Sequence, residues 1–341
     1  MKKGEKMKIL LDAMGGDHCP DEAIKGAVSA LEEIESTITL IGNEKLIINK
    51  IKEIYNKDSI KELSPRLDII NAMEVIENTD KPLKAIKIKK ESSMVKGFKL
   101  MRDNQYDVFV SSGNTGAFMA GGTLLVGRIE GIDRPALTAI MPAYKGCFMI
   151  VDAGANANCR SINFVQFAHM GSIYMNKVLG IEKPKVALLN IGAEEEKGTE
   201  LLKETYQLLK VDKDINFIGN IEGRYIFDGS VDVVVSDGFT GNIAIKTSEG
   251  IGAMVYQILK EELTKSIITK LGAMLIMKAL KNFKKRLDYT EYGGGILLGL
   301  EKPLVKCHGG AKEKSFKSTI LQAEKYAQSN AINNIKEELK K

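Results

Sequence analysis

The sequence of 341 residues has no tryptophan, few aromatic side chains and only four cysteines. The cysteines are scattered without a C-x-x-C pair, which argues against both a zinc cage and a disulfide framework. No run of about 18 or more uncharged apolar residues occurs, so no transmembrane helix is predicted. The N-terminal segment MKKGEKMK lacks the apolar core of a secretory signal. We therefore expect a cytoplasmic protein with reduced cysteines.

Several motifs that would indicate a cofactor or a nucleophile are also absent. No G-x-G-x-x-G follows the first predicted strand and no G-x-x-x-x-G-K-[ST] occurs, which weakens the case for NAD and ATP. The serine-hydrolase motif G-x-S-x-G is missing, so no enzyme-bound nucleophile is indicated. The net charge is only +5, which is a poor profile for a protein that binds nucleic acid.

What the sequence does contain is a regular alternation of short β-branched runs with longer helical patterns. Runs such as VALLN and VDVVVS are continuously apolar, as strands buried on both faces are. This predicts an α/β protein with a mostly parallel sheet covered by helices, and no linker divides residues 1–341 into separate units. The predicted strands are 7–13, 38–41, 67–70, 107–110, 137–141, 148–151, 186–190, 215–218, 231–235 and 304–307.

Many of these strands run into a segment rich in Gly, Asn and Asp. Carboxyl ends of parallel strands bind ligands beside helix N-termini, so we expect these segments to converge on one site that holds an oxyanion. Inorganic phosphate fits such a site, because it is already largely a nucleophilic dianion at neutral pH. The alternative is that Gly, Asn and Asp serve the turns themselves.

Seven motifs then occur in order over residues 7–335: LLDAMGGDHCP, SSGNTGA, GRIEGIDRPA, DAGAN, NIGAEEEKG, SDGFTGN and YGGGILLG. Together they resemble the bacterial PlsX family of phosphate acyltransferases, also called acyl-ACP:phosphate transacylases. The resemblance implies transfer of a fatty acyl group from acyl carrier protein to inorganic phosphate, for phospholipid synthesis. It also implies a three-layer α/β/α fold similar to isocitrate and isopropylmalate dehydrogenases and to phosphotransacetylase. A homodimer without metal or nucleotide is implied too, and residues 1–6 precede the family's usual start.

The resemblance and the loop positions together select the candidate site residues. We expect Lys197, just before a helix that starts at Gly198, to contact the attacking phosphate or the thioester oxygen. His308 is expected to orient phosphate or protonate the departing thiolate, and Asn242 completes the catalytic set. Residues expected to position substrate or phosphate are Asp12, Gly15, Gly16, Asp17, His18, Asn114, Thr115, Asp152, Asn156, Asn190, Asp237 and Gly294. For Asp12, Asp17, Asp152 and Asn156 the alternative is that they hold the loops together.

Other functions stay open at this stage. A phosphotransacetylase would use a coenzyme A thioester, whereas a decarboxylating dehydrogenase on the same fold would need a divalent metal and a nicotinamide. A membrane- or nucleic-acid-binding module with a vestigial site is a non-enzymatic alternative. Because carrier proteins are acidic, a basic patch is expected near the site, with Arg128, Arg134 and Lys246 as candidates.

The charge of the chain is concentrated in one segment. From Thr264 to Leu287 there are seven basic residues and no Asp or Glu. Within 266–287 apolar residues recur at three- and four-residue steps, which predicts one amphipathic basic helix. We expect peripheral binding to an anionic membrane, with contacts from Leu271, Met274, Leu275 and Lys278. The alternative is a helix of the dimer interface.

Overall fold

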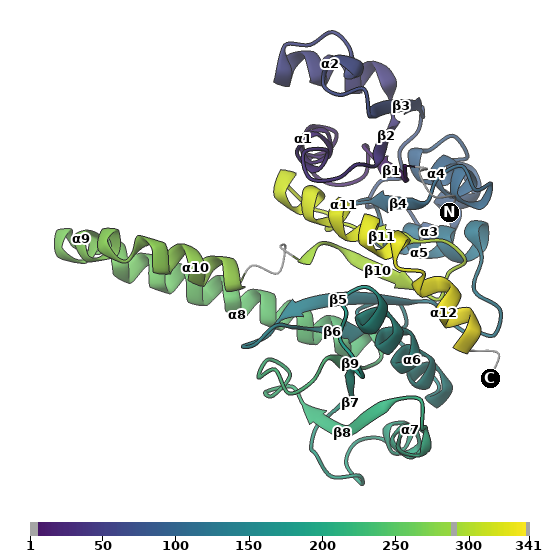
Figure 1. The fold of residues 1–341 in the computed structure, drawn as a ribbon, viewed down its shortest axis with the longest axis vertical. Coiled ribbons are helices and arrows are strands. Elements are labelled where there is room, and N and C mark those ends of the chain that lie inside the picture. The colour runs from purple at the N-terminus through teal and green to yellow at the C-terminus, as the bar shows by residue number, and fades with distance from the viewer. Residues whose placement is uncertain (1–5, 288–291, 339–341) are drawn as a thin grey trace.

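A single mixed sheet forms the middle layer of the molecule (Figure 1). The computed structural model describes residues 6–287 and 292–338, so residues 1–5 of the expected N-terminal extension lie outside the described part. The strands are β1 (Lys8–Asp12), β2 (Thr37–Gly42), β3 (Leu67–Asn71), β4 (Val108–Ser111), β5 (Ala136–Pro142), β6 (Cys147–Val151), β7 (Lys185–Asn190), β8 (Asn216–Glu222), β9 (Val233–Val235), β10 (Gly295–Leu298) and β11 (Leu304–Lys306). Across the sheet they follow the order β3-β2-β1-β4-β11-β10-β5-β6-β9-β7-β8.

Helices cover both faces of this sheet. One face carries α1 (Asp21–Ala30), α2 (Glu44–Tyr55), α6 (Ser161–Lys177), α7 (Glu200–Val211), α11 (Glu313–Gln328) and α12 (Ala331–Glu338). The other carries α3 (Pro82–Ile88), α4 (Ser93–Arg102), α5 (Thr115–Gly121) and the start of α8 (Gly238–Thr264). Short helical turns lie at η1 (Ile60–Glu62) and η2 (Gly122–Val126). The predicted three-layer α/β/α fold with a mostly parallel sheet is confirmed.

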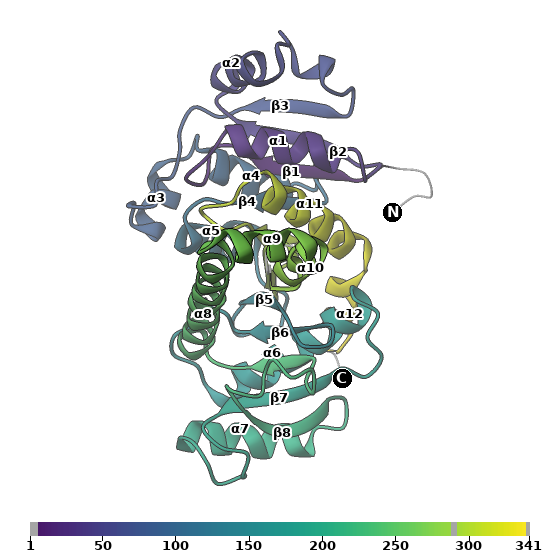
Figure 2. The same ribbon diagram turned by 90° about the vertical axis from the view of Figure 1, so that its left-hand side faces the viewer.

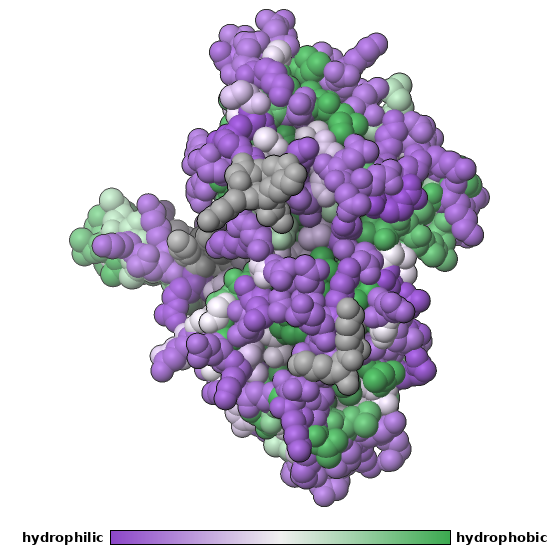
Figure 3. Space-filling view, turned by 45° about the vertical axis from the view of Figure 1, so that its right-hand side comes forward, coloured by the Kyte–Doolittle hydropathy of each residue, from purple (hydrophilic) through white to green (hydrophobic). Residues whose placement is uncertain are grey.

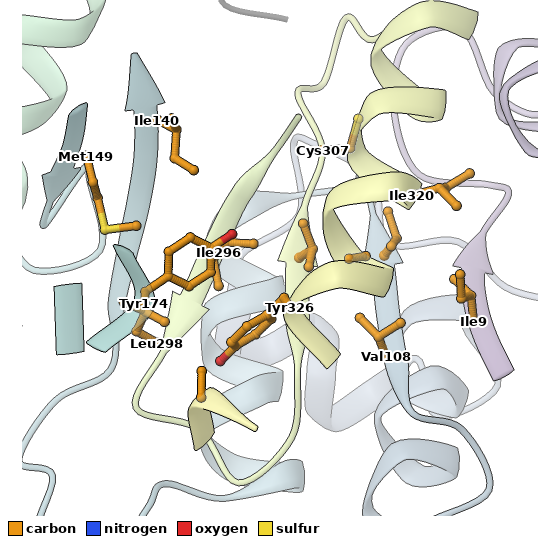
Figure 4. Packing of buried hydrophobic residues seen from close by; sticks show 14 of the residues in the cluster. Ile9, Val108, Ile140, Met149, Tyr174, Ile296, Leu298, Cys307, Ile320 and Tyr326 are labelled. Atoms are coloured by element: carbon orange, nitrogen blue, oxygen red, sulfur yellow. The ribbon is translucent and has the colours of Figure 1, made fainter. Parts of the chain in front are cut away.

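The strands are apolar on both sides because both faces are buried. On β1, Ile9 and Leu11 join one buried cluster, whereas Leu10 between them joins the cluster on the opposite face. Figure 4 shows part of the first cluster, in which Ile320 and Tyr326 of α11 pack over the sheet. This two-sided burial explains why the strands read as continuous apolar runs.

The direction of the strands reverses near the middle of the sheet. The pairs β10–β11, β10–β5 and β5–β6 are antiparallel, whereas the other strand pairs are parallel. Within the sheet, β6, β7, β8 and β9 therefore run against β1 to β4. The sequence did not predict β10, which lies inside the glycine-rich motif YGGGILLG.

An arm of three helices projects from the body (Figures 1 and 2). The helix α8 leads outward, and α9 (Ile267–Leu275) and α10 (Met277–Leu287) return along it to the body, where Arg286 donates to the carbonyl of Tyr144 (2.8 Å). No residue of α9 is buried, and apolar side chains gather near the end of the arm in Figure 3. None of the helices in the described ranges is long and apolar enough to cross a bilayer.

The prediction of one continuous helix over 266–287 is wrong. The segment breaks at Ile276, which ends α9 before α10 begins. Four consecutive apolar residues, 274–277, surround this break and point in different directions around the helix axis. The amphipathic character holds for each of the two shorter helices.

Candidate functional site

A first loop cluster lies where β1, β4 and β11 end, and Asp12 joins two of its loops. Its carboxylate accepts hydrogen bonds from the backbone N–H groups of Met14 (3.1 Å) and Gly15 (3.2 Å) and from Ser111 Oγ (2.7 Å). A Cβ on Gly15 would lie 2.5 Å from the backbone of Gly113, so this close approach requires glycine. These bonds are the ones expected if Asp12 holds the loops together.

The rest of the first loop presents exposed polar groups. The backbone N–H of Asp17 donates to the carbonyl of Gly309 (2.9 Å), and its carboxylate accepts from Asn78 Nδ2 (3.3 Å). Gly16 has φ +100°, and His18 is exposed at the end of the loop. The first loop therefore lies against the loop that follows β11.

Lys306, the last residue of β11, places a buried ammonium group in this cluster. Only 7% of the residue is exposed, and Nζ donates to the carbonyl oxygens of Ser112 (3.1 Å) and Cys307. None of the ion pairs found among the described residues involves it. Burial lowers the pKa of Lys306 from 10.5 to about 8, so at neutral pH it is mostly a cation. A buried cation with only carbonyl partners is suited to an anionic ligand.

His308 lies two residues further on, at the exposed surface of the cluster. The N–H of Gly310 donates to Nδ1 (3.2 Å), which places the proton of the neutral ring on Nε2. Loss of hydration and the Lys246 ammonium lower the pKa of His308, while Glu249 opposes this shift. Lys246 and Glu249 form an ion pair on α8 (2.6 Å), and because both charges act on His308 this helix faces the first cluster.

Asn114 and Thr115 begin α5 in the same cluster. The side-chain oxygen Oδ1 of Asn114 caps the helix by accepting from Ala117 N–H (2.9 Å). Its amide Nδ2 donates to the backbone carbonyls of Glu77 (3.2 Å) and Asp80 (3.3 Å). Asn114 therefore binds the loop before α3 to the site, while Thr115 is exposed at the start of the helix.

A second loop cluster lies where β6 and β9 end. The buried carboxylate of Asp152 accepts from the N–H groups of Leu137 (3.1 Å), Gly154 (3.1 Å) and Ala155 (3.0 Å). It also accepts from the backbone N–H (2.6 Å) and the side-chain amide (2.7 Å) of Asn156. Burial raises the pKa of Asp152 even though these donors favour the carboxylate. Asp152 and Asn156 thus have the bonds of loop-holding residues.

The helix α8 starts in this second cluster. Asp237 is its N-cap and accepts from the N–H (2.7 Å) and hydroxyl (2.9 Å) of Thr240. Asn242 is exposed in the next turn, beside Gly154. Its side chain therefore faces the loop that Asp152 organises.

Asn190 and Lys197 belong to the loop after β7, which flanks the second cluster because β7 lies next to β9. Asn190 closes its own loop by donating to the carbonyl of Lys197 (3.0 Å). The helix begins later than expected, since Thr199 is the N-cap of α7 and Gly198 has φ +90°. The Lys197 side chain is exposed.

The expected convergence of all loops on one site is only partly right. The reversal at β5 and β6 divides the loops into two clusters, which α8 links by carrying Lys246 past His308. Gly294 lies beside the backbone of Lys306 in the first cluster, where a Cβ on it would collide with the Lys306 carbonyl oxygen, and its N–H donates to Gln322 Oε1 (2.8 Å). A hollow of about 400 Å³ lined by Lys8 and other residues lies at the amino end of β1. The two clusters and the first three turns of α8 therefore make up the candidate site.

The cysteines beside the clusters are not activated. Burial raises the pKa of Cys19 to about 12 and that of Cys159 to about 11, so both are neutral thiols. Over residues 6–287 and 292–338, no three His, Cys, Asp or Glu side chains gather as a metal site requires. Besides the carboxylates of Asp17 and Asp237, the groups available at the site are hydrogen-bond donors and cations.

Sequence reasoning missed Lys306. It stands in a predicted strand, and a lysine at a strand end reads as solvated unless its burial is known. The only available signal was its position two residues before His308, at the carboxyl end of that strand.

The family comparison matches residues 7–334 to the model described as "Fatty acid synthesis protein". A phosphate acyltransferase from Thermoanaerobacter pseudethanolicus is 49% identical over 334 residues, which cover 98% of this chain and 97% of that one. A phosphate acyltransferase from Alkaliphilus oremlandii is 49% identical over 331 residues, which cover 97% of each chain.

Solved structures share the fold. A phosphotransacetylase from Streptococcus pyogenes has a TM-score of 0.65 at 15% identity, covering 96% of this chain and 94% of that one. A putative 4-hydroxythreonine-4-phosphate dehydrogenase from Salmonella typhimurium has a TM-score of 0.52 at 14% identity, covering 94% and 99%. The expected likeness of fold to phosphotransacetylase is confirmed. Because the family model and the relatives match almost the whole length, the chain belongs to the PlsX family of phosphate acyltransferases and is an acyltransferase.

Proposed function

We propose that this acyltransferase moves a fatty acyl group from the thioester of acyl carrier protein to inorganic phosphate. The products are acyl phosphate and free carrier protein, and the acyl phosphate feeds phospholipid synthesis. Membership of the phosphate acyltransferases supports the acceptor. The observation that carries the proposal is the buried Lys306 ammonium, which donates to backbone carbonyls and forms no ion pair among the described residues, although Asp12 and Asp17 lie near enough to favour its charge.

The reaction needs little from the enzyme beyond positioning and positive charge. A phosphate oxygen attacks the carbonyl carbon, the C–S bond breaks, and the carrier leaves as a thiolate that takes a proton from water. Because free thiols have a pKa of about 8.5, this leaving group requires no strong acid. Cations that face the phosphate and the developing oxyanion supply the main stabilisation.

Each cluster contributes one part of this chemistry. Lys306 and the Nε2–H of His308 hold phosphate in the first cluster, and the lowered pKa of His308 favours this neutral donor over an acid. In the second, Lys197 and Asn242 face the thioester oxygen. We assign these four residues as the catalytic set.

The deciding experiment measures release of the carrier thiol from acyl carrier protein with and without phosphate. We expect thiol release only with phosphate, together with formation of acyl phosphate. Parallel reactions contain acetyl-CoA with phosphate, or NAD with a 2-hydroxy acid. Turnover confined to acetyl-CoA would replace the proposal by a phosphotransacetylase, and NAD reduction would replace it by a dehydrogenase.

The proposal includes a homodimer that binds membranes peripherally through the arm. An acyl phosphate is labile, so release beside the membrane shortens its path to the next enzyme. On α9 the exposed fractions of Leu275 (89%) and Met274 (66%) leave a large apolar surface beside exposed lysines such as Lys278. Lysines near an anionic leaflet contribute roughly 1 kcal/mol each, and buried apolar side chains add to this.

A further inference from the structure

A second basic surface lies on the body of the molecule, around α3. Residues 81–90 read KPLKAIKIKK and contain no Asp or Glu. We define the α3 surface by its exposed lysines and its exposed apolar residues: Lys81, Lys84, Lys87, Lys90, Leu83 and Ile88. Leu83 is 59% exposed and Ile88 63% exposed, so the lysines surround accessible apolar area.

None of the four lysines of the α3 surface forms an ion pair with another residue that the structure describes. Lys89 alone of this run pairs with a carboxylate, that of Asp80 (2.5 Å), within the described part of the chain. An ordinary solvated face mixes both signs of charge, so a one-sign face with exposed apolar residues indicates an interaction surface.

The α3 surface is joined directly to the candidate site. In the loop before α3, the carbonyls of Glu77 and Asp80 accept from the Asn114 amide, as described above. The carbonyl of Asn78 accepts from the same Nδ2 (3.2 Å). A Cβ on Gly116 of α5 would lie 2.6 Å from Pro82, so the two helices begin in close contact. Figure 2 shows α3 beside α5 on the body. A partner bound to α3 is thus next to the first loop cluster.

The three cations that the sequence suggested for a basic patch near the site already have partners within the protein. Arg128 donates to the carbonyl of Asp133, and Arg134 donates to the carbonyl of Asn158 (2.8 Å). Lys246 pairs with Glu249 (2.6 Å). These three cations therefore already have hydrogen-bond or ion-pair partners within the protein, whereas the lysines of the α3 surface form no ion pair among the described residues.

We propose that the α3 surface docks an acidic carrier protein that delivers the acyl thioester to the first loop cluster. This inference rests on the proposed function. Lysines at the rim of an interface raise the association rate and make it sensitive to salt, and Leu83 and Ile88 supply the apolar centre. A membrane is the less fitting occupant, since two apolar side chains on a short helix give little insertion. The surface also lies away from the end of the arm (Figure 1).

The test reverses the charge of two lysines, Lys84→Glu with Lys87→Glu. The control makes the same charge change at two other exposed lysines, Lys177→Glu with Lys213→Glu. Lys177 ends α6 and Lys213 lies in the loop after α7, so both are on the half of the molecule built around β6 to β9. Both variants are assayed with long-chain acyl carrier protein and with acyl-CoA of the same chain. Binding of free carrier protein is measured by titration calorimetry, and thermal unfolding checks the fold.

For the α3 variant we expect kcat/KM with acyl carrier protein to fall about 10-fold and to lose its salt dependence. Carrier affinity should weaken equally, while acyl-CoA turnover and the control stay unchanged. Unchanged carrier kinetics, or an equal loss with both thioesters, would overturn the docking role. Cosedimentation of both variants with anionic vesicles tests the other occupant: loss of binding in the α3 variant with normal carrier kinetics would assign α3 to the membrane instead. Absence of phosphate-dependent turnover in the wild type would overturn the proposed function itself.

Discussion

The protonation state of Lys306 should control how the rate falls at alkaline pH. We expect kcat/KM for phosphate to fall above about pH 8, because the ammonium that binds the anion has a pKa of about 8. In Lys306→Arg the guanidinium stays charged, so the fall should move to higher pH. The pH–rate profiles of the two enzymes, at saturating acyl donor, measure this difference.

Because arginine is larger than lysine and the position is buried, Lys306→Met is the second variant. It should lose activity at every pH. The free energy of unfolding of the wild type should rise as the pH increases from about 8 to 10.5. In this range Lys306 has lost its proton in the folded protein, where its pKa is about 8, but keeps it in the unfolded chain, where its pKa is 10.5. The gain is on the order of 3 kcal/mol and should be missing in Lys306→Met. If the free energy of unfolding changed with pH in the same way in both proteins, Lys306 would not be a buried cation.

Lys197 is exposed, so its replacement should leave the fold intact. If it supplies charge to the oxyanion, Lys197→Ala should lower kcat about 10²-fold or more. The matched control is Lys203→Ala on α7, where Lys203 pairs with Glu200 (2.9 Å). Near-normal turnover of Lys197→Ala in a steady-state assay would remove this residue from the mechanism.

At this scale the sequence locates polar residues but not their hydrogen-bond partners. Asp12, Asp152 and Asn114 lie at strand ends as expected, yet their oxygens are occupied by backbone N–H groups and hydroxyls of their own loops. Whether a carboxylate faces a ligand or a neighbouring loop depends on contacts between segments far apart in the chain, and residue type does not encode these. The same holds for the burial of Lys306.

At the scale of elements, the loop after β6 is held by one side chain, that of Asp152. Asp152→Ala should destabilise the protein by about 3 kcal/mol, because several buried N–H groups lose their acceptor. Urea unfolding measures the loss. The control is Asp228→Ala, which removes a carboxylate that accepts from Ser230 N–H (2.7 Å) in an exposed turn. It should lower the free energy of unfolding by less than about 1 kcal/mol. A stable Asp152→Ala with a raised KM for phosphate would favour the substrate-positioning alternative.

The arm should bind anionic vesicles but not zwitterionic ones. Replacing Met274 and Leu275 by Glu should abolish cosedimentation, because both side chains are exposed on α9, while acyl transfer in solution stays largely intact. The matched control is Leu208→Glu with Val211→Glu, two exposed apolar residues on α7. Equal binding to both vesicle types, or dissociation of a dimer by the arm variant, would favour the interface alternative.

The elements themselves were largely predictable. Strands buried on both faces are continuously apolar, so β7 and β9 are visible in the sequence, and Pro20 marks the start of α1. The four-residue strand β10 was missed because its flanking glycines read as a loop. The break at Ile276 was missed because the period of apolar residues on either side is helical.

At the scale of the whole molecule, the exposed apolar stripe on α8 predicts a dimer contact. Ile251, Met254, Val255 and Ile258 follow a spacing of three and four residues, and between 40% and 54% of each is exposed. Met254→Asp with Ile258→Asp should convert a dimer to a monomer in light scattering. A wild type that is already monomeric, or a variant that stays dimeric, would contradict this contact.

The topology of the whole sheet was the least predictable feature. Alternating strands and helices indicate a parallel sheet. Only six residues separate the predicted strands 137–141 and 148–151, which is too short for a parallel crossover, so the antiparallel β5–β6 pair could have been predicted. The two antiparallel pairs of β10 could not, because β10 itself was not predicted. Strand pairing is decided by packing between distant segments, and for this reason the expected single site became two clusters linked by α8.

The position of β11 has a consequence for synthesis of the protein. It is the last strand in the described part of the chain, yet it lies between β4 and β10 near the centre of the sheet. Strands β5 to β9 come from one continuous stretch, 136–235, so all of their pairings with one another are available once this stretch has left the ribosome. Until residues 304–306 emerge, the apolar strand β4 keeps an open edge. The nascent chain therefore carries a template for wrong pairing through most of its translation, which is where a chaperone would act.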